Sequence, residues 1–349
     1  MSNHKVPISV TMITYNHEKY IAESIQSVLE QTFADFELIV VNDGSTDRTD
    51  EIIRTFQDPR ITYIYQENQG PSVAINNAIL AAQGKYVALM SGDDVCYPQR
   101  LEKQYLYAKK EQKSILFSWV DFIDDDSRPS IKNYLPKSYF NLGNKSRSEI
   151  LSHFFFQGNY LCAPTAFIEK KLLLDAELFC TTSIQLQDFD MWIKLLPEGE
   201  FFLSTEKLLK YRRRKHGFNL SNKRNLLRSN FEASQIYRHI FNNIDSSLFK
   251  EAFYDFLFRK DFDGKHEYEI EKSFLYFNHN LPFIREIGVE RLFKLLQNKE
   301  TLMIAIEKYD FGLPRLYEFM QDEKKIDKNR LLKFRHLIDK KYMRIFSLV

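Results

Sequence analysis

The sequence predicts an α/β fold, with a Rossmann-like, mostly parallel sheet flanked by helices and followed by an α-helical C-terminal region. Two observations support this. Over the first 120 of the 349 residues, short apolar runs of strand length alternate with helical patterns. Beyond about Asn222 no strand-like alternation persists, and the patterns become those of amphipathic helices. Strands that alternate with helices are joined by right-handed crossovers, so the sheet should be largely parallel.

The order of the elements follows from the apolar periodicity. Strands are expected at 6–14, 36–41, 61–65, 86–90 and 115–123, with helices between them at 21–29, 49–56, 72–82 and 98–113. Residues 124–148 are polar and interrupted by Pro and Gly, which predicts a long loop. The pattern then predicts a helix from 149, a strand at 161–168, a helix, a further helix at 189–196 and a strand at 201–203. Later predicted helices include 226–241, 284–296 and 331–345. We therefore predict a domain of residues 1–221 (with the parts 1–123, the loop 124–148 and 149–221) and a helical domain of residues 222–349.

The composition excludes several classes of protein. With 44 % hydrophobic and 28 % charged residues, the chain is globular rather than disordered or fibrous. A net charge of +2 gives no excess of the size that nucleic-acid binding requires. The three cysteines form no disulfide framework, and the sequence has neither a signal-peptide pattern nor an apolar run of membrane-spanning length. We expect a cytoplasmic protein, and peripheral contact with the cytoplasmic membrane face stays open.

Three polar clusters directly follow predicted strands. They are residues 14–16 (Thr-Tyr-Asn), 42–47 (Asn-Asp-Gly-Ser-Thr-Asp) and 91–94 (Ser-Gly-Asp-Asp). Turn formation or helix capping would explain any one of them. In a parallel sheet, however, all three lie on one rim, where ligands bind. Together they favour a binding site.

The adjacent carboxylates of Asp93 and Asp94 point to a metal. Two neighbouring carboxylates repel each other, and a hard divalent cation relieves that repulsion. Mg²⁺ or Mn²⁺ typically takes one or two carboxylates together with substrate phosphate oxygens. The sequence has no P-loop and no dinucleotide-binding glycine pattern. A nucleotide bound by this fold would therefore have its phosphates bridged by metal.

Two further charged stretches occur later in the chain. Asp188 and Asp190 begin a predicted helix, and favourable interaction with the helix dipole explains one acid better than two. From Lys207 to Asn230 there are nine Lys or Arg residues and no acid. A solvated basic face is the usual explanation for such a stretch. Beside an anionic site, binding of a diphosphate or attraction to acidic lipid headgroups is comparably plausible.

In combination these stretches resemble glycosyltransferase family 2, whose members have the GT-A fold. The resemblance runs in consistent order from about residue 5 to 222. It is carried by residues 8–16, 31–47, 68–70, 91–94 with Pro98 and Arg100-Leu101, 187–192, 211–212 and 216–221.

The resemblance implies an inverting transferase (a hexosyl- or N-acetylhexosaminyltransferase). Such an enzyme moves a sugar from a nucleotide-sugar, often a UDP-sugar, to a hydroxyl of a glycan or lipid-linked glycan, in the biosynthesis of surface polysaccharide, O-antigen, capsule or glycoconjugates. It also implies that 1–123 is the nucleotide-binding half of the first domain and 149–221 the acceptor half, and it implies roles for particular residues. Asp188 would be the general base, and Asp94 and His216 would bind Mn²⁺ or Mg²⁺. The nucleotide would be held by Thr14, Tyr15, Asn16, Asp43 and Asp93. Weaker assignments to the diphosphate or the acceptor are Gln69, Asp190, Arg212, Arg214, Asn219 and Ser221.

Two positions depart from the family pattern. Ser91 stands where the family usually has the first acid of its Asp-x-Asp-Asp motif. Ile75 stands where many members have an arginine that helps to bind the nucleotide. The second departure leaves open a catalytically impaired nucleotide-sugar-binding or scaffold protein that acts through its helical C-terminal region. A transferase whose acceptor is polyprenyl phosphate, and a homodimer formed through the C-terminal helices, also stay open.

Overall fold

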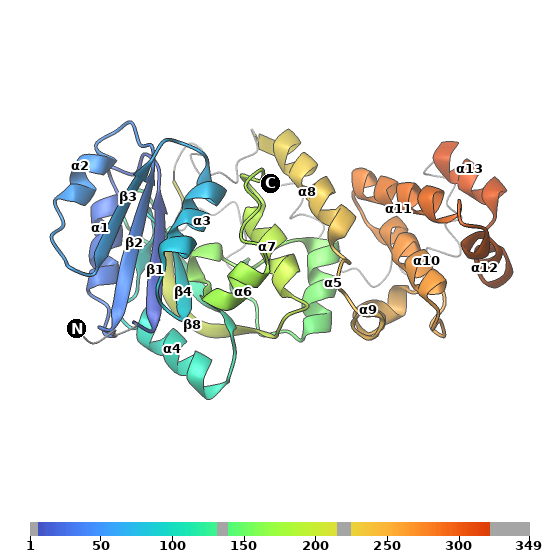
Figure 1. Cartoon of the computed structure of the whole chain (residues 1–349), viewed down its shortest axis with the longest axis horizontal. Coiled ribbons are helices and arrows are strands. Elements are labelled where there is room, and N and C mark those ends of the chain that lie inside the picture. Colours follow the sequence, from blue (N-terminus) through green and yellow to red (C-terminus); the bar gives the residue numbers. More distant parts are fainter. Residues whose placement is uncertain (1–5, 131–138, 215–224, 322–349) are drawn as a thin grey trace. The chain divides into compact units, whose positions relative to one another are not determined.

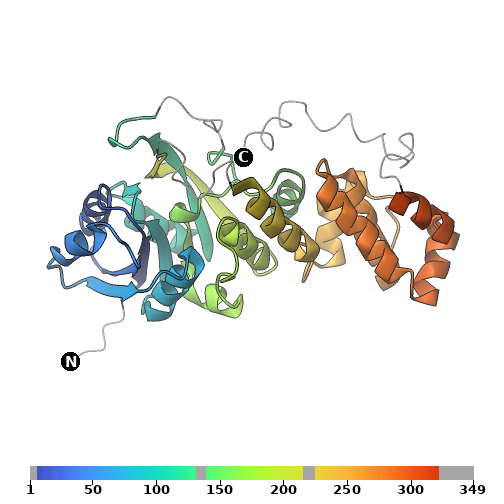
Figure 2. The same cartoon turned by 90° about the horizontal axis from the view of Figure 1, so that it is seen from above.

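The structure, a computed structural model, describes residues 6–130, 139–214 and 225–321. It divides into two compact units (Figures 1 and 2). The first comprises Met1–Ser146 and Asn159–Leu226, and the second Arg147–Gly158 and Leu227–Val349. The helix α5 (Arg147–Gln157) therefore groups with the C-terminal helices, whereas the sequence placed 149–221 in the first domain. Aromatic packing explains the difference, because Phe155 of α5 contacts Phe253 and Tyr276 in the second unit.

One eight-stranded sheet forms the frame of the first unit, in the order β3-β2-β1-β4-β7-β6-β8-β5. The strands are β1 (Ile8–Thr14), β2 (Phe36–Asp43), β3 (Ile61–Gln66), β4 (Tyr86–Ser91), β5 (Val95–Cys96), β6 (Ile115–Ile123), β7 (Phe167–Glu169) and β8 (Phe201–Arg212). Strands β3, β2, β1 and β4 are parallel, as are β6 and β8. Strand β7 is antiparallel to both of its neighbours, and β5 is antiparallel to β8. The predicted α/β class is confirmed, and its sheet is mixed beyond β4.

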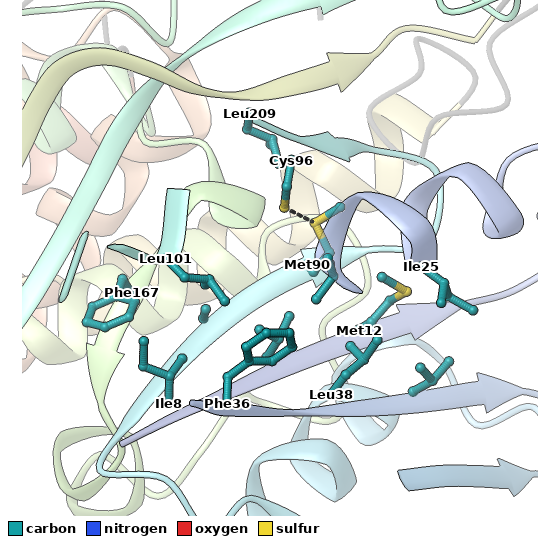
Figure 3. Close-up of a cluster of buried hydrophobic side chains, with 14 of the residues drawn as sticks. Ile8, Met12, Ile25, Phe36, Leu38, Met90, Cys96, Leu101, Phe167 and Leu209 are labelled. Atoms are coloured by element: carbon teal, nitrogen blue, oxygen red, sulfur yellow. Dashed lines mark hydrogen bonds between the residues drawn. The ribbon is translucent and has the colours of Figure 1, made fainter. Parts of the chain in front are cut away.

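Helices cover both faces of this sheet. They are α1 (Ile21–Leu29), α2 (Thr49–Arg54), α3 (Pro71–Ala81), α4 (Arg100–Lys110), α6 (Lys170–Asp175) and α7 (Gln187–Leu195). Alternate residues of β1, β2 and β4 pack with α1 and α4 in one buried cluster (Figure 3). In this cluster the Cys96 thiol lies 3.5 Å from the Met90 sulfur. Helix α3 packs on β1 and β2. Burial of both faces accounts for the nearly continuous apolar runs of the central strands.

Two strands differ from their predicted extents. The strand expected at 161–168 is limited to β7, preceded by a 3₁₀ turn at Ala163–Thr165. Pro164 lies inside that turn, and a proline has no N–H to donate to a strand ladder. The strand expected at 201–203 continues to Arg212, paired along its length with β6.

The second unit consists of helices in its described part. Besides α5 they are α8 (Leu226–His239), α9 (Ser246–Phe253), α10 (Lys265–Leu275), α11 (Pro282–Leu295), α12 (Lys299–Tyr309) and α13 (Leu313–Gln321), with short 3₁₀ turns between them. Phe274, Phe277, Tyr309 and Phe311 pack in one of its buried clusters, so these aromatic residues form core. The helix expected at 331–345 lies outside the described residues. Within the described ranges no helix has the length and apolarity needed to cross a membrane.

Candidate active site

The first three polar clusters meet at one end of the sheet. In the strand register Thr14 lies beside Asn42, and Ile13 lies beside Ser91. The residues that follow β1, β2 and β4 therefore share the rim formed by the carboxyl ends of these strands, where ligands of open α/β sheets bind.

Asp43 shapes this rim. Its carboxylate accepts hydrogen bonds from the side chain of Gln66 (2.7 Å) and from the backbone N–H groups of Gln69 (2.9 Å) and Gly70 (3.0 Å). Gly44 has a φ of +71°, and a Cβ there would lie 2.6 Å from the backbone nitrogen of Asn68. Asp43 and Gly44 thus hold the turn that leads into α3. Gln69, expected near the diphosphate or acceptor, lies in this turn with an exposed side chain.

The segment after β1 is fixed to the loop after β2. Asn16 is in the left-handed region, with a φ of 52°, which asparagine tolerates better than most residues. Its side-chain oxygen accepts from the Thr46 N–H at 2.8 Å, and its own N–H donates to the Ser45 hydroxyl at 2.9 Å. Thr14 is buried, whereas Tyr15 is 43 % exposed. Of these three residues, Tyr15 presents the most surface to a ligand.

Asp93 lies among three polar side chains. Its carboxylate accepts a hydrogen bond from the Ser91 hydroxyl (2.5 Å) and lies 3.3 Å from Arg214 Nε and 3.8 Å from His17 Nε2. Burial lowers the pKa of His17, so the ring is neutral near pH 7 and Arg214 provides the countercharge. The sequence-based reasoning missed His17, although this residue directly follows the 14–16 cluster.

Asp94 is the more deeply buried member of the acidic pair, at 1 % exposed. One oxygen, Oδ1, accepts a hydrogen bond from the backbone N–H of Arg212 at 2.8 Å. Its Oδ2 is buried and has no hydrogen-bond partner among the residues that the structure describes. Burial, and then the charge of Asp93, raise the pKa of Asp94 well above its usual value. A hard cation would satisfy the orphaned oxygen and remove this repulsion, so the residues present fit a divalent metal.

The Arg212 guanidinium is buried and makes its described contacts with groups of the protein itself. The antiparallel register of β5 and β8, with Val95 beside Lys210, brings it next to the acidic pair. The guanidinium stacks over the ring of Tyr20, 4.6 Å from its centroid, and its side chain is 0 % exposed. It donates hydrogen bonds to the Asp93 carbonyl (2.7 Å), the Asp124 carbonyl (2.6 Å), the Glu23 carboxylate (2.7 Å) and the Ser127 hydroxyl (2.9 Å). These contacts fit a structural role better than the diphosphate or acceptor contact expected from the sequence.

Replacing Arg212 with methionine is expected to lower the free energy of unfolding by about 3–5 kcal/mol, because buried acceptors and an ion-pair partner are left without their donor. Urea unfolding would measure the loss. Arg128→Met is the matched control: its side chain is 77 % exposed, and a change below about 0.5 kcal/mol is expected. Equal stability losses in the two variants would contradict the structural role of Arg212.

Asp188 lies in the first turn of α7 and is half-buried. Its carboxylate accepts hydrogen bonds from the Asn159 side chain (2.9 Å) and from the Phe189 N–H (2.7 Å). Asp190, in the same turn, is buried and pairs with Lys194 at 3.0 Å one helical turn later. His216, Asn219 and Ser221 lie outside the described residues, so their predicted roles stay predictions.

Cys162 is a buried thiol that directly precedes the 3₁₀ turn at Ala163–Thr165. The pKa of Cys162 is raised well above its usual value, chiefly by burial and then by the negative charges of Asp94 and Asp188. His17, Cys162 and Asn159 belong to none of the sequence clusters.

Comparison with known proteins agrees with this arrangement. The family model for glycosyl transferase family 2 matches residues 9–173. An uncharacterized glycosyltransferase of Methanocaldococcus jannaschii is 36 % identical over 212 residues, which are 59 % of this chain and 70 % of the relative. A putative teichuronic acid biosynthesis glycosyltransferase of Bacillus subtilis, TuaG, is 36 % identical over 132 residues, 37 % of this chain and 52 % of that protein.

Solved structures show the same fold. TarS 1–349 of S. aureus in complex with UDP-GlcNAc superposes with a TM-score of 0.58 at 17 % identity, covering 93 % of this chain and 89 % of that one. A mannosyltransferase from Pyrobaculum calidifontis, in complex with GDP-Man and Mn²⁺, gives a TM-score of 0.50 at 14 % identity, covering 91 % and 86 %. With the rim geometry, the family match and the archaeal relative in agreement, the chain belongs to glycosyl transferase family 2.

Proposed function

We propose that the protein is an inverting glycosyltransferase that moves a sugar from a nucleotide-sugar, in our proposal a UDP-sugar, to a hydroxyl of a glycan or lipid-linked glycan. The observation that carries the proposal is the buried Asp94 carboxylate at the strand rim, which keeps one oxygen without a hydrogen-bond partner among the described residues. This carboxylate suits a metal, and the half-buried Asp188 carboxylate supplies the base. The complex of TarS with UDP-GlcNAc supports a UDP-sugar donor.

The proposed reaction uses Asp188 as the general base. As the acceptor oxygen forms its bond to the anomeric carbon, the hydroxyl proton passes to the Asp188 carboxylate. The bond between the anomeric carbon and the diphosphate oxygen breaks on the opposite face, and the nucleoside diphosphate leaves with the bonding electrons. An aspartate with a reference pKa of about 3.9 is sufficient because the hydroxyl becomes acidic only as the new bond forms.

Asp94 would hold Mn²⁺ or Mg²⁺, together with His216 by the family resemblance. When bound, the metal would offset the negative charge that grows on the leaving diphosphate. Asp93, neutralised by Arg214, would contact the ribose or diphosphate. Thr14, Tyr15, Asn16 and Asp43 would form the nucleotide side of the rim, with Tyr15 contributing its exposed ring.

The proposed acceptor class is supported by the name of one relative. The name of TuaG refers to teichuronic acid biosynthesis, which supports a surface polysaccharide as the product to which this protein contributes. The proposal also includes a hexosyl or N-acetylhexosaminyl donor. It further includes a cytoplasmic location, peripheral contact with the membrane and a homodimer formed through the C-terminal helices.

A donor panel tests the proposal. The purified protein would be incubated with UDP-, GDP- and dTDP-sugars, with Mn²⁺ or with EDTA, while donor hydrolysis and thermal shift are followed. We expect one nucleotide class to be hydrolysed slowly in Mn²⁺ and not in EDTA. If no nucleotide bound, the proposed transferase activity would be contradicted and a scaffold protein would be favoured. The presence of Ile75 where many family members have arginine would then explain the loss of nucleotide binding. Ile75 lies in α3 and is only 6 % exposed.

A further inference from the structure

The Asp188 carboxylate is held by a residue outside the stretches that carry the family resemblance. Its Oδ2 accepts a hydrogen bond of 2.9 Å from the side-chain amide of Asn159. Asn159 stands 29 positions earlier in the chain and outside α7. The contact therefore fixes the carboxylate relative to the rest of the first unit and not only relative to its own helix.

The direction of the Asn159 amide is determined by its other contacts. Its Oδ1 accepts a hydrogen bond of 2.9 Å from the backbone N–H of Leu161, so the NH₂ group must be the end that faces Asp188. The backbone carbonyl of Asn159 accepts a hydrogen bond of 2.7 Å from the Tyr139 hydroxyl. Tyr160 and Leu161, which follow, are buried and anchor the segment. Asn159 is therefore a pre-oriented donor.

Other titratable groups surround this pair. Burial and then the charge of Asp188 raise the pKa of Tyr139 to about 12, so the phenol stays protonated and donates. The Cys162 thiol, also influenced by Asp188, stays neutral for the same reasons. On α7 itself, Asp190 is compensated by Lys194. Arg213 acts on Tyr139 with the opposite sign. The Asn159 amide is therefore a neutral donor to Asp188, near a phenol and a thiol that keep their protons.

We propose that Asn159 is a positioning residue that keeps the Asp188 carboxylate ionised and in a single orientation for the acceptor proton. A donor to the charged form of an acid favours that form, and a general base works only within hydrogen-bond reach of its proton. The catalytic part of this role rests on the proposed function, whereas the effect on ionisation does not.

The ionisation of Asp188 can be measured without any substrate. In protein labelled with ¹³C at the aspartate carboxyls, the Asp188 resonance is identified by its loss in Asp188→Asn, and its titration midpoint is read by NMR. We expect Asn159→Ala to raise that midpoint by about one pH unit or more, a tenfold change in the ionisation constant. A midpoint unchanged within about 0.2 unit would overturn the proposal, because one pH unit is the effect of a single hydrogen bond to a charged group.

The isosteric variant Asn159→Asp covers the case in which the alanine variant fails to fold. Near pH 7 its second carboxylate repels Asp188, and we expect the pair to take up its first proton at a higher pH than the Asp188 midpoint in Asn159→Ala. When that proton lies on the introduced carboxyl, its O–H can donate to Asp188 as the amide did. The kcat of this variant relative to the unmodified protein should therefore recover as the pH falls, with KM for the hydrolysed donor unchanged. A uniform loss at every pH would contradict the positioning role.

Asn76→Ala is the matched control. The Asn76 amide, like that of Asn159, makes two hydrogen bonds, but both are to backbone: it donates to the Phe179 carbonyl (2.8 Å) and accepts from the Phe179 N–H (2.9 Å). The variant should lose stability and keep the Asp188 midpoint. If no donor is hydrolysed by the unmodified protein, the proposed function fails, while the titration still decides the role of Asn159.

Discussion

Replacing Asp188 with asparagine is expected to lower kcat for sugar transfer by about 10²–10⁴-fold, the usual contribution of a general base. The amide has nearly the same shape as the carboxylate, and it can still accept a hydrogen bond from the Phe189 N–H. It cannot take the proton of the acceptor hydroxyl. The nucleotide-induced thermal shift should therefore be retained, because the nucleotide side of the proposed site is formed by the strand rim and not by α7.

Comparison with Asp190→Asn identifies which of the two neighbouring acids is the base. Asp190 is paired with Lys194 within α7, so its loss should reduce stability and change kcat by only a few-fold. The kcat of each variant would be measured with the donor found in the panel. The stability of each variant would be measured by thermal shift in the presence of the nucleoside diphosphate. If Asp188→Asn kept most of its activity, or if Asp190→Asn carried the loss, the assignment of the base would be wrong.

The local hydrophobic pattern of the sequence was sufficient to predict much of the fold. The helix expected at 21–29 is α1, and the strand expected at 115–123 is β6, because each depends on its own periodicity. The two-residue strand β5 was missed. It exists only through its pairing with β8, more than a hundred residues later. The placement of α5 likewise depends on Phe155 and its distant aromatic partners.

In the candidate site, too, some residues could be predicted from local pattern and others depend on contacts between distant segments. Residues directly after the strands were found because the topology of a parallel sheet places all strand ends on one rim. Asn159 could not be found in this way, since its contact with Asp188 depends on the tertiary meeting of two segments without a shared motif. Arg212 was found for its charge, but its role depends on which carbonyls surround the guanidinium.

Asp94→Asn is expected to abolish metal-dependent donor hydrolysis, a loss of about 10²-fold or more since the metal contributes several kcal/mol of charge stabilisation. In the absence of metal, the Asp94→Asn variant should also be thermally more stable than the unmodified protein. Burial and the charge of Asp93 hold the pKa of Asp94 well above its value in the unfolded chain. The stability that this acid contributes is therefore present below about pH 3.8, and it is lost as the pH rises through the folded pKa.

Asparagine resembles the protonated acid at every pH, so the variant should keep that stability at neutral pH. In EDTA we expect its Tm to exceed that of the unmodified protein, by about 2–4 °C for each kcal/mol recovered, and the gap to widen as the pH rises above about 4. Mn²⁺ should stabilise the unmodified protein and not the variant. Asp93→Asn should act in the opposite direction, because the Asp93 carboxylate pairs with the Arg214 guanidinium at 3.3 Å and the neutral amide loses this ion pair. Equal losses of Tm in both variants would contradict this division of roles, in which one carboxylate is compensated by the protein and its neighbour is left for the metal.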